Sequence, residues 1–235
     1  MIEARVPASV HAVPDDAGRL VLLDSATGHW FVLNRSGAVF YQELRSVADI
    51  DQAADAVVAR YPAVPADRIR RDVDELVSAL VARGLVELPD TGGRHPAGVL
   101  MAVPADEAPV DRRRRLAAAF AFLVALLLLR LPFRTSAALV AKLKRSKPVA
   151  STADALSALG AARWASRWYP GRVACVELSL TAVLTAAFLG GRVDWCFGFT
   201  ADPYSFHAWI EVDGEPVTHP ADEPVPPTYR RVFRA

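Results

Sequence analysis

Two short runs with strand-like apolar patterning lie near the start of the chain. Residues 19–24 and 29–33 have this pattern, and the four residues between them, Ser-Ala-Thr-Gly, have the composition of a turn. A weaker strand-like run precedes them at residues 9–13. The pattern therefore predicts a β-hairpin with a third strand beside it.

Helical patterns follow the hairpin. Asn34 or Ser36 can cap a first helix that runs to about residue 44, and Asp49 can cap a second that ends at residues 61–62 (Tyr-Pro). Asp67 begins a third helix, which Gly84 is placed to end. Four apolar residues recur at helical spacing in the third helix: Ile69, Val73, Leu76 and Leu80. Three strands followed by three helices predict a compact winged-helix-like module over residues 1–88.

Residues 89–111 separate this module from a second unit. They are rich in Pro, Gly, Asp and Ala, which is typical of a linker. The second unit, 112–235, opens with helical patterns. We expect helices over residues 116–129, 136–143 and 153–168, and a fourth from Cys175 to the glycines 190–191.

Strand patterns close the second unit. Residues 193–199 and 206–212 alternate large apolar and other side chains, and Asp213-Gly214 is a strong hairpin signal before a returning strand at 215–219. Helices followed by an antiparallel sheet predict an α+β fold of the papain-like or transglutaminase-like kind.

Composition narrows the function without fixing it. The 235 residues are 52% hydrophobic, which is enough for two small cores, and the net charge of +1 gives no indication of nucleic-acid binding. The N-terminus lacks the basic and apolar regions of a signal peptide, so a reducing cytoplasm is the expected location. The two cysteines, Cys175 and Cys196, do not form the framework of a disulfide-rich protein.

One apolar run raises the question of a membrane. Residues 116–129 are uninterrupted apolar residues between the arginines 112–115 and Arg130. The run is shorter than the roughly 20 residues that a spanning helix needs. We expect a fully buried helix, and membrane association is possible but not favoured.

Cys175 and His207 carry the candidate chemistry. Cys175 opens a predicted helix, where unpaired backbone N–H groups and the helix dipole favour a thiolate, and His207 leads a predicted strand and can take the thiol proton. The backbone N–H of Cys175 is then a candidate oxyanion donor. Cys196 alternates with large aromatic residues inside a strand and is interpreted as structural.

The residue that would orient His207 is open between two candidates. With a three-residue turn centred on Asp213, position 219 lies across from His207; with a two-residue turn at Asp213-Gly214, position 220 does. Position 219 is a histidine, and Asp222 is the alternative third member if the strand ends early.

The segment around these residues resembles the leader peptidase of lasso-peptide biosynthesis, the B protein. The resemblance rests on Cys-Val-Glu-Leu-Ser-Leu from Cys175, the glycines 190–191, residues 197–199 (Phe-Gly-Phe), and residues 201–214, which contain His207. It extends upstream through residues 168–172 and the apolar run. That family places an Asp 12 residues after its catalytic His, where this chain has His219.

The first unit has its own resemblance. Residues 22–34 resemble the small leader-recognition element that is similar to the pyrroloquinoline-quinone chaperone PqqD. The two resemblances imply a fused protein whose first unit binds the leader of a ribosomally made (RiPP) precursor and whose second unit removes it. They also imply a partner lasso cyclase, asparagine-synthetase-like, that closes the macrolactam.

A peptide could be captured by pairing with an edge strand beside an amphipathic helix. The candidate edge is 29–32 and the candidate helix is 67–80. The candidate peptide-binding residues are His29, Trp30, Phe31, Val32, Val73 and Leu76.

Two other functions remain open: a leader-binding scaffold whose hydrolase core is impaired, and a transglutaminase-like acyltransferase in which an amine replaces water as the acceptor. No paired metal-ligand spacing and no phosphate-binding glycine loop is present in the sequence, so neither a metal nor another cofactor is expected.

Overall fold

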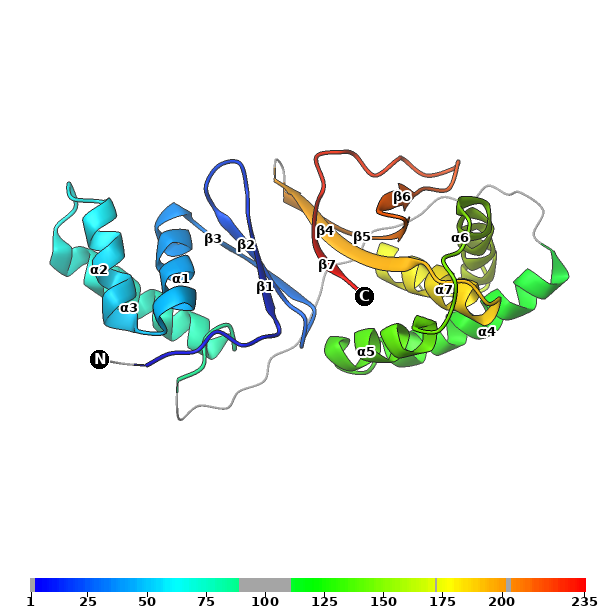
Figure 1. Cartoon of the computed structure of the whole chain (residues 1–235), viewed down its shortest axis with the longest axis horizontal. Coiled ribbons are helices and arrows are strands. Elements are labelled where there is room, and N and C mark those ends of the chain that lie inside the picture. Colours follow the sequence, from blue (N-terminus) through cyan, green and yellow to red (C-terminus); the bar gives the residue numbers. More distant parts are fainter. Residues whose placement is uncertain (1–2, 89–110, 172, 202–203) are drawn as a thin grey trace. The chain divides into compact units, whose positions relative to one another are not determined.

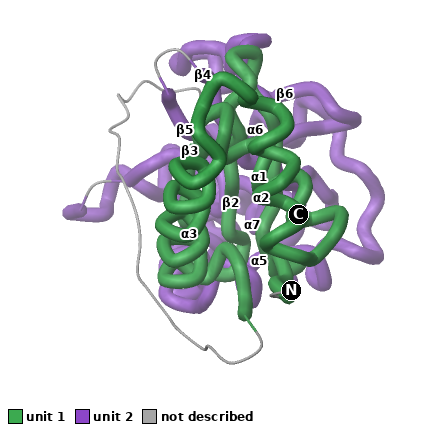
Figure 2. The backbone as a smooth tube through the Cα atoms, turned by 90° about the vertical axis from the view of Figure 1, so that its left-hand side faces the viewer, with its two compact units in different colours: residues 1–98 green, residues 99–235 purple. Residues whose placement is uncertain are grey.

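The computed structural model describes residues 3–88, 111–171, 173–201 and 204–235. It divides into two compact units, residues 1–98 and 99–235 (Figures 1 and 2). Most of the predicted linker, residues 89–110, lies outside the described residues. Each unit has its own helices and its own antiparallel sheet.

Unit 1 begins with the predicted hairpin. Its strands are β1 (Val10–Pro14), β2 (Leu20–Asp24) and β3 (His29–Leu33), paired antiparallel in the order β1-β2-β3. Asp24 fixes the turn, since its carboxylate accepts hydrogen bonds from the backbone N–H of Ala26 at 2.9 Å and from the Thr27 hydroxyl at 2.7 Å. Gly28 then supplies a left-handed backbone, with φ of 82°.

Three helices complete unit 1: α1 (Arg35–Val47), α2 (Ile50–Arg60) and α3 (Ala66–Ala82). Of the two candidates for the first cap, Asn34 has that role, because its side chain accepts from the Gly37 N–H. Asp49 caps α2 as predicted, and α3 starts after Pro65, one residue earlier than expected. The buried faces of all three helices share one core with Leu20, Leu22 and Leu33 of the sheet. The winged-helix-like prediction is confirmed.

Unit 2 is α+β, as predicted. Its helices are α4 (Arg112–Leu128), α5 (Phe133–Lys144), α6 (Thr152–Ser166) and α7 (Cys175–Phe188), and its strands are β4 (Asp194–Ala201), β5 (Tyr204–Val212), β6 (Glu215–Val217) and β7 (Arg230–Arg234). The strands form an antiparallel sheet in the order β6-β5-β4-β7 (Figure 1).

Helix α7 is the centre of unit 2. It is apolar on all sides, and every residue from Leu178 to Ala187 is buried, as expected for a helix surrounded by other elements. It packs on β4 and β5 on one side and on α4 and α6 on the other. Its Ser179 hydroxyl accepts a 3.0 Å hydrogen bond from the indole N–H of Trp195, which ties α7 to β4. This packing fixes where the first residue of α7, Cys175, lies against the sheet.

Helix α4 differs from the fully buried helix that we expected. It packs on α6 and α7 through Ala118, Ala121, Phe122 and Ala125, but its opposite face is exposed. The expectation was wrong because a run that is apolar on all sides does not reveal how many of its sides the protein covers. Within the residues that the structure describes, none of the helices has the length and apolarity to cross a membrane.

Strand β7 was not predicted from the sequence. Its sequence, Arg-Arg-Val-Phe-Arg, is too basic to read as a strand. Tertiary contacts support it instead: Arg231 forms an ion pair with Glu211 of β5, and the Phe233 ring contacts Phe133 and Phe197.

Candidate active site

Cys175 is the first residue of α7. Its neighbour Ala174 is the N-cap residue, with an extended backbone, and has no side-chain oxygen to cap the helix. The Glu177 carboxylate instead accepts a 3.0 Å hydrogen bond from the Ala174 N–H. The thiol therefore lies at the positive end of the helix dipole, with a carboxylate in the same turn.

The thiol is buried enough to shift its titration. Burial raises the pKa of Cys175, and this outweighs hydrogen bonds from the backbone N–H groups of Ala208, Cys175 and Val176, which lower it; the Glu177 charge raises it further. The sequence predicted that the helix start would favour a thiolate. In this structure the N–H groups act as expected, but desolvation has the larger effect and favours the neutral thiol.

His207 lies on β5, directly before the Ala208 whose N–H bonds the thiol. It pairs with Gly198 of β4, where an added Cβ would collide with the Trp209 ring and the Arg230 carbonyl. The imidazole stacks 6.1 Å from the Trp209 ring and meets the Tyr229 ring edge-on at 5.9 Å. Gly198 thus leaves room for the Trp209 ring, which packs with Tyr229 against the His207 imidazole.

Burial lowers the pKa of His207, and the Asp222 carboxylate opposes this shift. At neutral pH the imidazole is therefore the uncharged form, which can accept a proton. Both pKa shifts, that of Cys175 upward and that of His207 downward, favour a neutral thiol and a neutral imidazole over the ion pair.

The backbone of β5 brings the two groups to neighbouring positions. The Cys175 thiol accepts a hydrogen bond from the Ala208 N–H, and among the described residues no hydrogen bond joins Cys175 to the His207 ring. Catalytic hydrogen bonds are often long in ligand-free enzymes and shorten once substrate is bound. The Ala208 contact therefore places Cys175 beside the strand that carries His207.

His219 does not lie across from His207. Val212 pairs with Glu215, so Asp213-Gly214 is a two-residue turn, and β6 ends at Val217. The His219 side chain is 7% exposed. Its Nδ1 accepts from the Ala221 N–H at 3.2 Å, and its ring packs over Gly160 of α6. The ring is thus held by a local hydrogen bond and by α6.

Asp222 is a carboxylate whose charge partly offsets the lowering of the His207 pKa by burial. Its backbone N–H donates to the His219 carbonyl at 2.8 Å. Its side chain forms an ion pair with Arg163 of α6, which is itself buried. Arg163 was not singled out from the sequence. The available signal was an arginine among the small residues of a helix, Ala161, Ala162 and Ala165.

Cys196 has a different environment from Cys175. It is fully buried in β4, and burial strongly raises its pKa, with the Glu211 charge adding to that effect and Arg231 opposing it. Both cysteines are free thiols. Cys196 therefore provides an internal control for the reactivity of Cys175.

In unit 1, β3 is an edge strand, because it pairs only with β2 in the three-stranded sheet. Val32 is exposed, His29, Trp30 and Phe31 are half-buried, and the His29 and Phe31 rings contact each other at 6.1 Å. On α3, Leu76 is half-buried, whereas Val73 is buried in the core. Four of the six predicted residues thus lie on the edge strand and are at least partly exposed. Val73 is instead a core residue.

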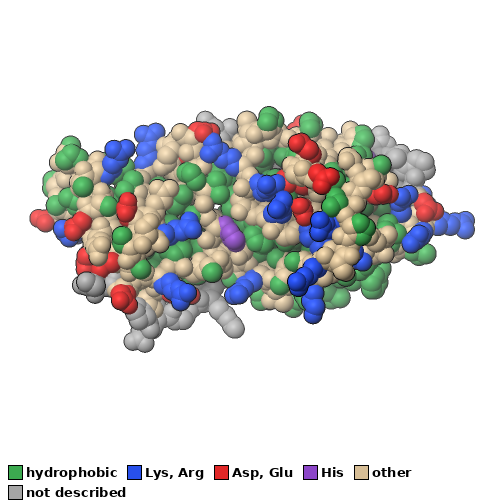
Figure 3. All heavy atoms as spheres, in the orientation of Figure 1, with side chains coloured by type: hydrophobic (Ala, Val, Ile, Leu, Met, Phe, Trp, Pro, Cys, Tyr) green, Lys and Arg blue, Asp and Glu red, His purple; other side chains and the backbone are tan. Residues whose placement is uncertain are grey.

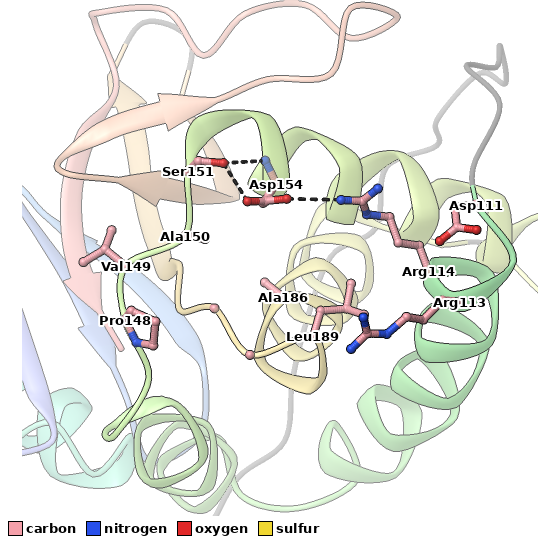
Figure 4. A pocket seen from close by; sticks show the side chains of 12 residues that line it. Asp111, Arg113, Arg114, Pro148, Val149, Ala150, Ser151, Asp154, Ala186 and Leu189 are labelled. Atoms are coloured by element: carbon pink, nitrogen blue, oxygen red, sulfur yellow. Dashed lines mark hydrogen bonds and ion pairs between the residues drawn. The ribbon is translucent and has the colours of Figure 1, made fainter.

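A cavity of about 500 Å³ lies at the other end of α7 from Cys175 (Figure 4). It is lined by the start of α4, residues 148–151 and the end of α7. Arg114 donates to Asp154 at 3.1 Å, and Asp154 also accepts from Ser151 at 2.7 Å. None of the predicted catalytic residues lines this cavity, so it is distinct from the candidate active site.

The described residues contain no cluster of three or more His, Cys, Asp or Glu able to hold a metal ion. A cysteine at the start of a central helix, beside a histidine on an antiparallel strand, defines the papain-like and transglutaminase-like class of fold.

Comparison with known families agrees with this class. Residues 102–233 match the family described as Transglutaminase-like superfamily, and residues 19–86 match Coenzyme PQQ synthesis protein D (PqqD). Because the first match spans more than half of the 235 residues, the chain belongs to the transglutaminase-like superfamily. No curated protein and no solved structure matched the chain.

Proposed function

We propose that this protein is a cysteine endopeptidase that binds and removes the leader of a lasso-peptide precursor. The observation that carries the proposal is the fusion of a PqqD-like unit with a transglutaminase-like unit that has Cys175 at the start of its central helix and His207 beside it. The resemblance of residues 168–214 to the lasso leader peptidases supplies the substrate class. Removal of the leader would precede macrolactam closure by a partner cyclase.

In the proposed reaction, His207 takes the proton of the Cys175 thiol as the sulfur attacks the carbonyl carbon of the bond after the leader. The tetrahedral oxyanion accepts hydrogen bonds from backbone N–H groups, of which that of Cys175 is the candidate. His207 then gives its proton to the departing amine of the core peptide. Water hydrolyses the thioester, which releases the leader with a free carboxylate and restores the thiol.

A neutral resting pair suits this mechanism. Since the pKa shifts favour uncharged Cys175 and His207, the proton moves during the attack rather than beforehand. We propose Asp222 as the residue that stabilises the imidazolium formed in that step, because its charge acts on His207 while His219 is held against α6.

Unit 1 would supply the substrate. The PqqD match and the edge strand β3 support capture of the leader as an added strand, with His29, Trp30, Phe31, Val32 and Leu76 lining the path. Backbone pairing gives affinity with little demand on sequence, and side chains beside the strand select among leaders.

The test is cleavage of a lasso-type precursor, read by mass spectrometry, with wild type, Cys175→Ala and Cys196→Ala. The proposal expects one cut at the leader–core junction in wild type and Cys196→Ala, and none in Cys175→Ala. Cleavage that persists in Cys175→Ala would contradict the proposal. An added amine acceptor separates hydrolysis from acyl transfer, because transfer leaves the leader as an amide, heavier than the hydrolysed leader by the mass of the amine less one water.

One observation favours a second candidate, a leader-binding scaffold with an impaired core. Burial raises the pKa of Cys175, and the expected carboxylate position is occupied by His219. A scaffold binds the leader and leaves it uncut even when the cyclase is added, so the same assay distinguishes the two.

A further inference from the structure

The exposed face of α4 is the largest feature that the proposed peptidase does not use. Four large apolar side chains lie along it at intervals of four, three and four residues: Leu116, Phe120, Leu123 and Leu127. They are 75%, 60%, 60% and 64% exposed. This spacing keeps them on one side of a helix, so they form a continuous stripe (the α4 stripe) about 16 Å long.

The stripe continues onto neighbouring elements. The ring of Phe120 contacts that of Phe188, the last residue of α7, at 5.4 Å. Leu131, after α4, and Leu139, on α5, are also exposed, at 43% and 44%. An exposed apolar surface of this extent on a folded unit marks a binding surface.

Charge along α4 and α5 is predominantly positive, although Asp111 directly precedes α4 and Asp154 pairs with Arg114. Residues 112–153 contain ten Lys and Arg and no Asp or Glu, in a chain whose net charge is only +1. Arg112, Arg113, Arg130 and Arg134 are exposed at the two ends of α4 and at the start of α5. Apolar and basic side chains lie side by side in the lower right of Figure 3, where α4 runs in Figure 1.

The four arginines at the start of α4 lie where the helix dipole disfavours positive charge. Arg112 to Arg115 occupy the first turn of α4, which has no acidic residue, although positive charge at a helix N-terminus is unfavourable. Two of them have partners: Arg114 pairs with Asp154, and Arg115 lies over the Trp164 ring at 5.3 Å. Arg112 and Arg113, in contrast, are exposed to solvent.

We propose that the α4 stripe docks on the surface of an anionic lipid bilayer. Leu116, Phe120, Leu123 and Leu127 would enter the boundary between headgroups and acyl chains, and the flanking arginines would contact the anionic headgroups. Charge complementarity favours this occupant, because four exposed arginines and a single exposed acidic residue, Asp111, lie at the ends of the stripe, and anionic lipid surfaces attract such basic segments.

The length of the stripe agrees with lying on the membrane. The 17 residues of α4 give a helix about 26 Å long, shorter than the roughly 30 Å hydrocarbon core, the stripe covers only about 16 Å of it, and the other face of α4 is engaged by α6 and α7. The helix thus stays part of unit 2 while its outer face enters the interface.

The test is flotation of the full chain with phosphatidylcholine vesicles and with vesicles of equal parts phosphatidylcholine and phosphatidylglycerol. We expect flotation with the anionic vesicles, at least about tenfold weaker binding to the neutral ones, and weakening with added salt. The variant Phe120→Gln/Leu123→Gln/Leu127→Gln should lose flotation, and Arg112→Gln/Arg113→Gln should weaken it about tenfold.

Val47→Gln is the matched control, because Val47 is an exposed apolar residue of unit 1; it should float as wild type does. Circular dichroism checks that each variant is folded. The proposal is overturned if wild type floats with neither vesicle, or if the triple Gln variant floats unchanged. It is also overturned if sedimentation finds a dimer that depends on the stripe while vesicles are not bound, since the surface would then serve a second copy of the chain.

Discussion

The two units have different proposed roles, leader binding in unit 1 and cleavage in unit 2, and their sheets differ accordingly. Unit 1 has a three-stranded sheet whose last strand, β3, has an open edge. In unit 2 the strand that carries His207, β5, pairs with β4 on one side and with β6 only at residues 210–212, and its Ala208 N–H contacts the first residue of α7. An open edge along a whole strand suits capture of an extended chain, whereas a strand whose backbone contacts the thiol suits the placement of reacting groups. The comparison predicts that binding and cleavage can be lost separately.

The largest separation should come from His207→Ala. Without the base, we expect cleavage to fall by about 10³-fold or more while leader affinity is unchanged. Single-turnover cleavage and fluorescence anisotropy of a labelled leader measure the two effects. His11→Gln is the control, because His11 is a half-buried histidine of unit 1, where it lies 3.2 Å from the Ser25 hydroxyl; it should cleave normally. Equal loss of leader binding and cleavage in His207→Ala would contradict the assignment of binding to unit 1 and cleavage to unit 2.

A comparison of Asp222→Asn with His219→Gln tests which residue in unit 2 is the third member beside Cys175 and His207. We expect about 10- to 100-fold slower cleavage for Asp222→Asn, because the charge that acts on His207 is removed, and at most about threefold for His219→Gln. The reverse order would make His219 the third member.

Removing the Asp222 charge also leaves Arg163 without its ionic partner, so the melting temperature of each variant is measured alongside. The double variant Arg163→Gln/Asp222→Asn restores charge balance at this position. If it recovers the melting temperature but not the cleavage rate, the role of Asp222 in catalysis is separate from its role in folding.

Val32→Pro should affect unit 1 alone. Proline removes one backbone N–H from the open strand, and we expect leader affinity to fall about tenfold with the cleavage rate at saturating precursor unchanged. Val32→Ala is the matched control, because it keeps the N–H and shortens the same side chain. If both variants lose affinity equally, side-chain contacts rather than strand pairing hold the leader.

The smallest effects concern pH. His207 must be neutral to act as base, and its pKa is lowered, so kcat/KM should fall only as the pH drops below 6.5, through that lowered pKa.

Alkylation of Cys175 should have its half-point above the ordinary thiol value, because burial raises its pKa. Glu177→Gln should lower that half-point slightly, since it removes a charge that contributes to the rise. A half-point below that of a free thiol would contradict the neutral pair.

Stability should follow the same signs. His11, His207 and His219 all have lowered pKa values in the folded chain, so the unfolded chain binds more protons below about pH 6.5. The melting temperature is therefore expected to drop as the pH falls from 7 through these values.

Local patterns predicted the elements of this chain well, and the tertiary environment explains the differences. Asn34 and Asp49 identified helix starts because capping is a local interaction. Strand β7 could not be predicted, since its basic residues are stabilised by partners distant in sequence such as Glu211. Helices α4 and α7 are both apolar runs in the sequence, yet only α7 is covered on all sides.

The candidate site shows the same limit. Residue type and local pattern were sufficient to single out Cys175 and His207. The position of His219 depended on a turn that could hold two or three residues, and the structure has the two-residue form. The upward pKa shift of Cys175 depends on burial by the whole unit, which no local pattern reports.

The central claim is that Cys175 is the nucleophile that attacks the bond after a bound leader. Its most direct test is intact-protein and fragment mass spectrometry of the full chain incubated with a leader peptide ending in a chloromethyl ketone, whose chloride a nucleophilic thiol displaces to form a stable thioether. The account predicts one adduct, on Cys175 and not on Cys196, that forms far more slowly with a scrambled leader. An adduct on Cys196, or equal labelling by leader and scrambled peptide, would contradict it.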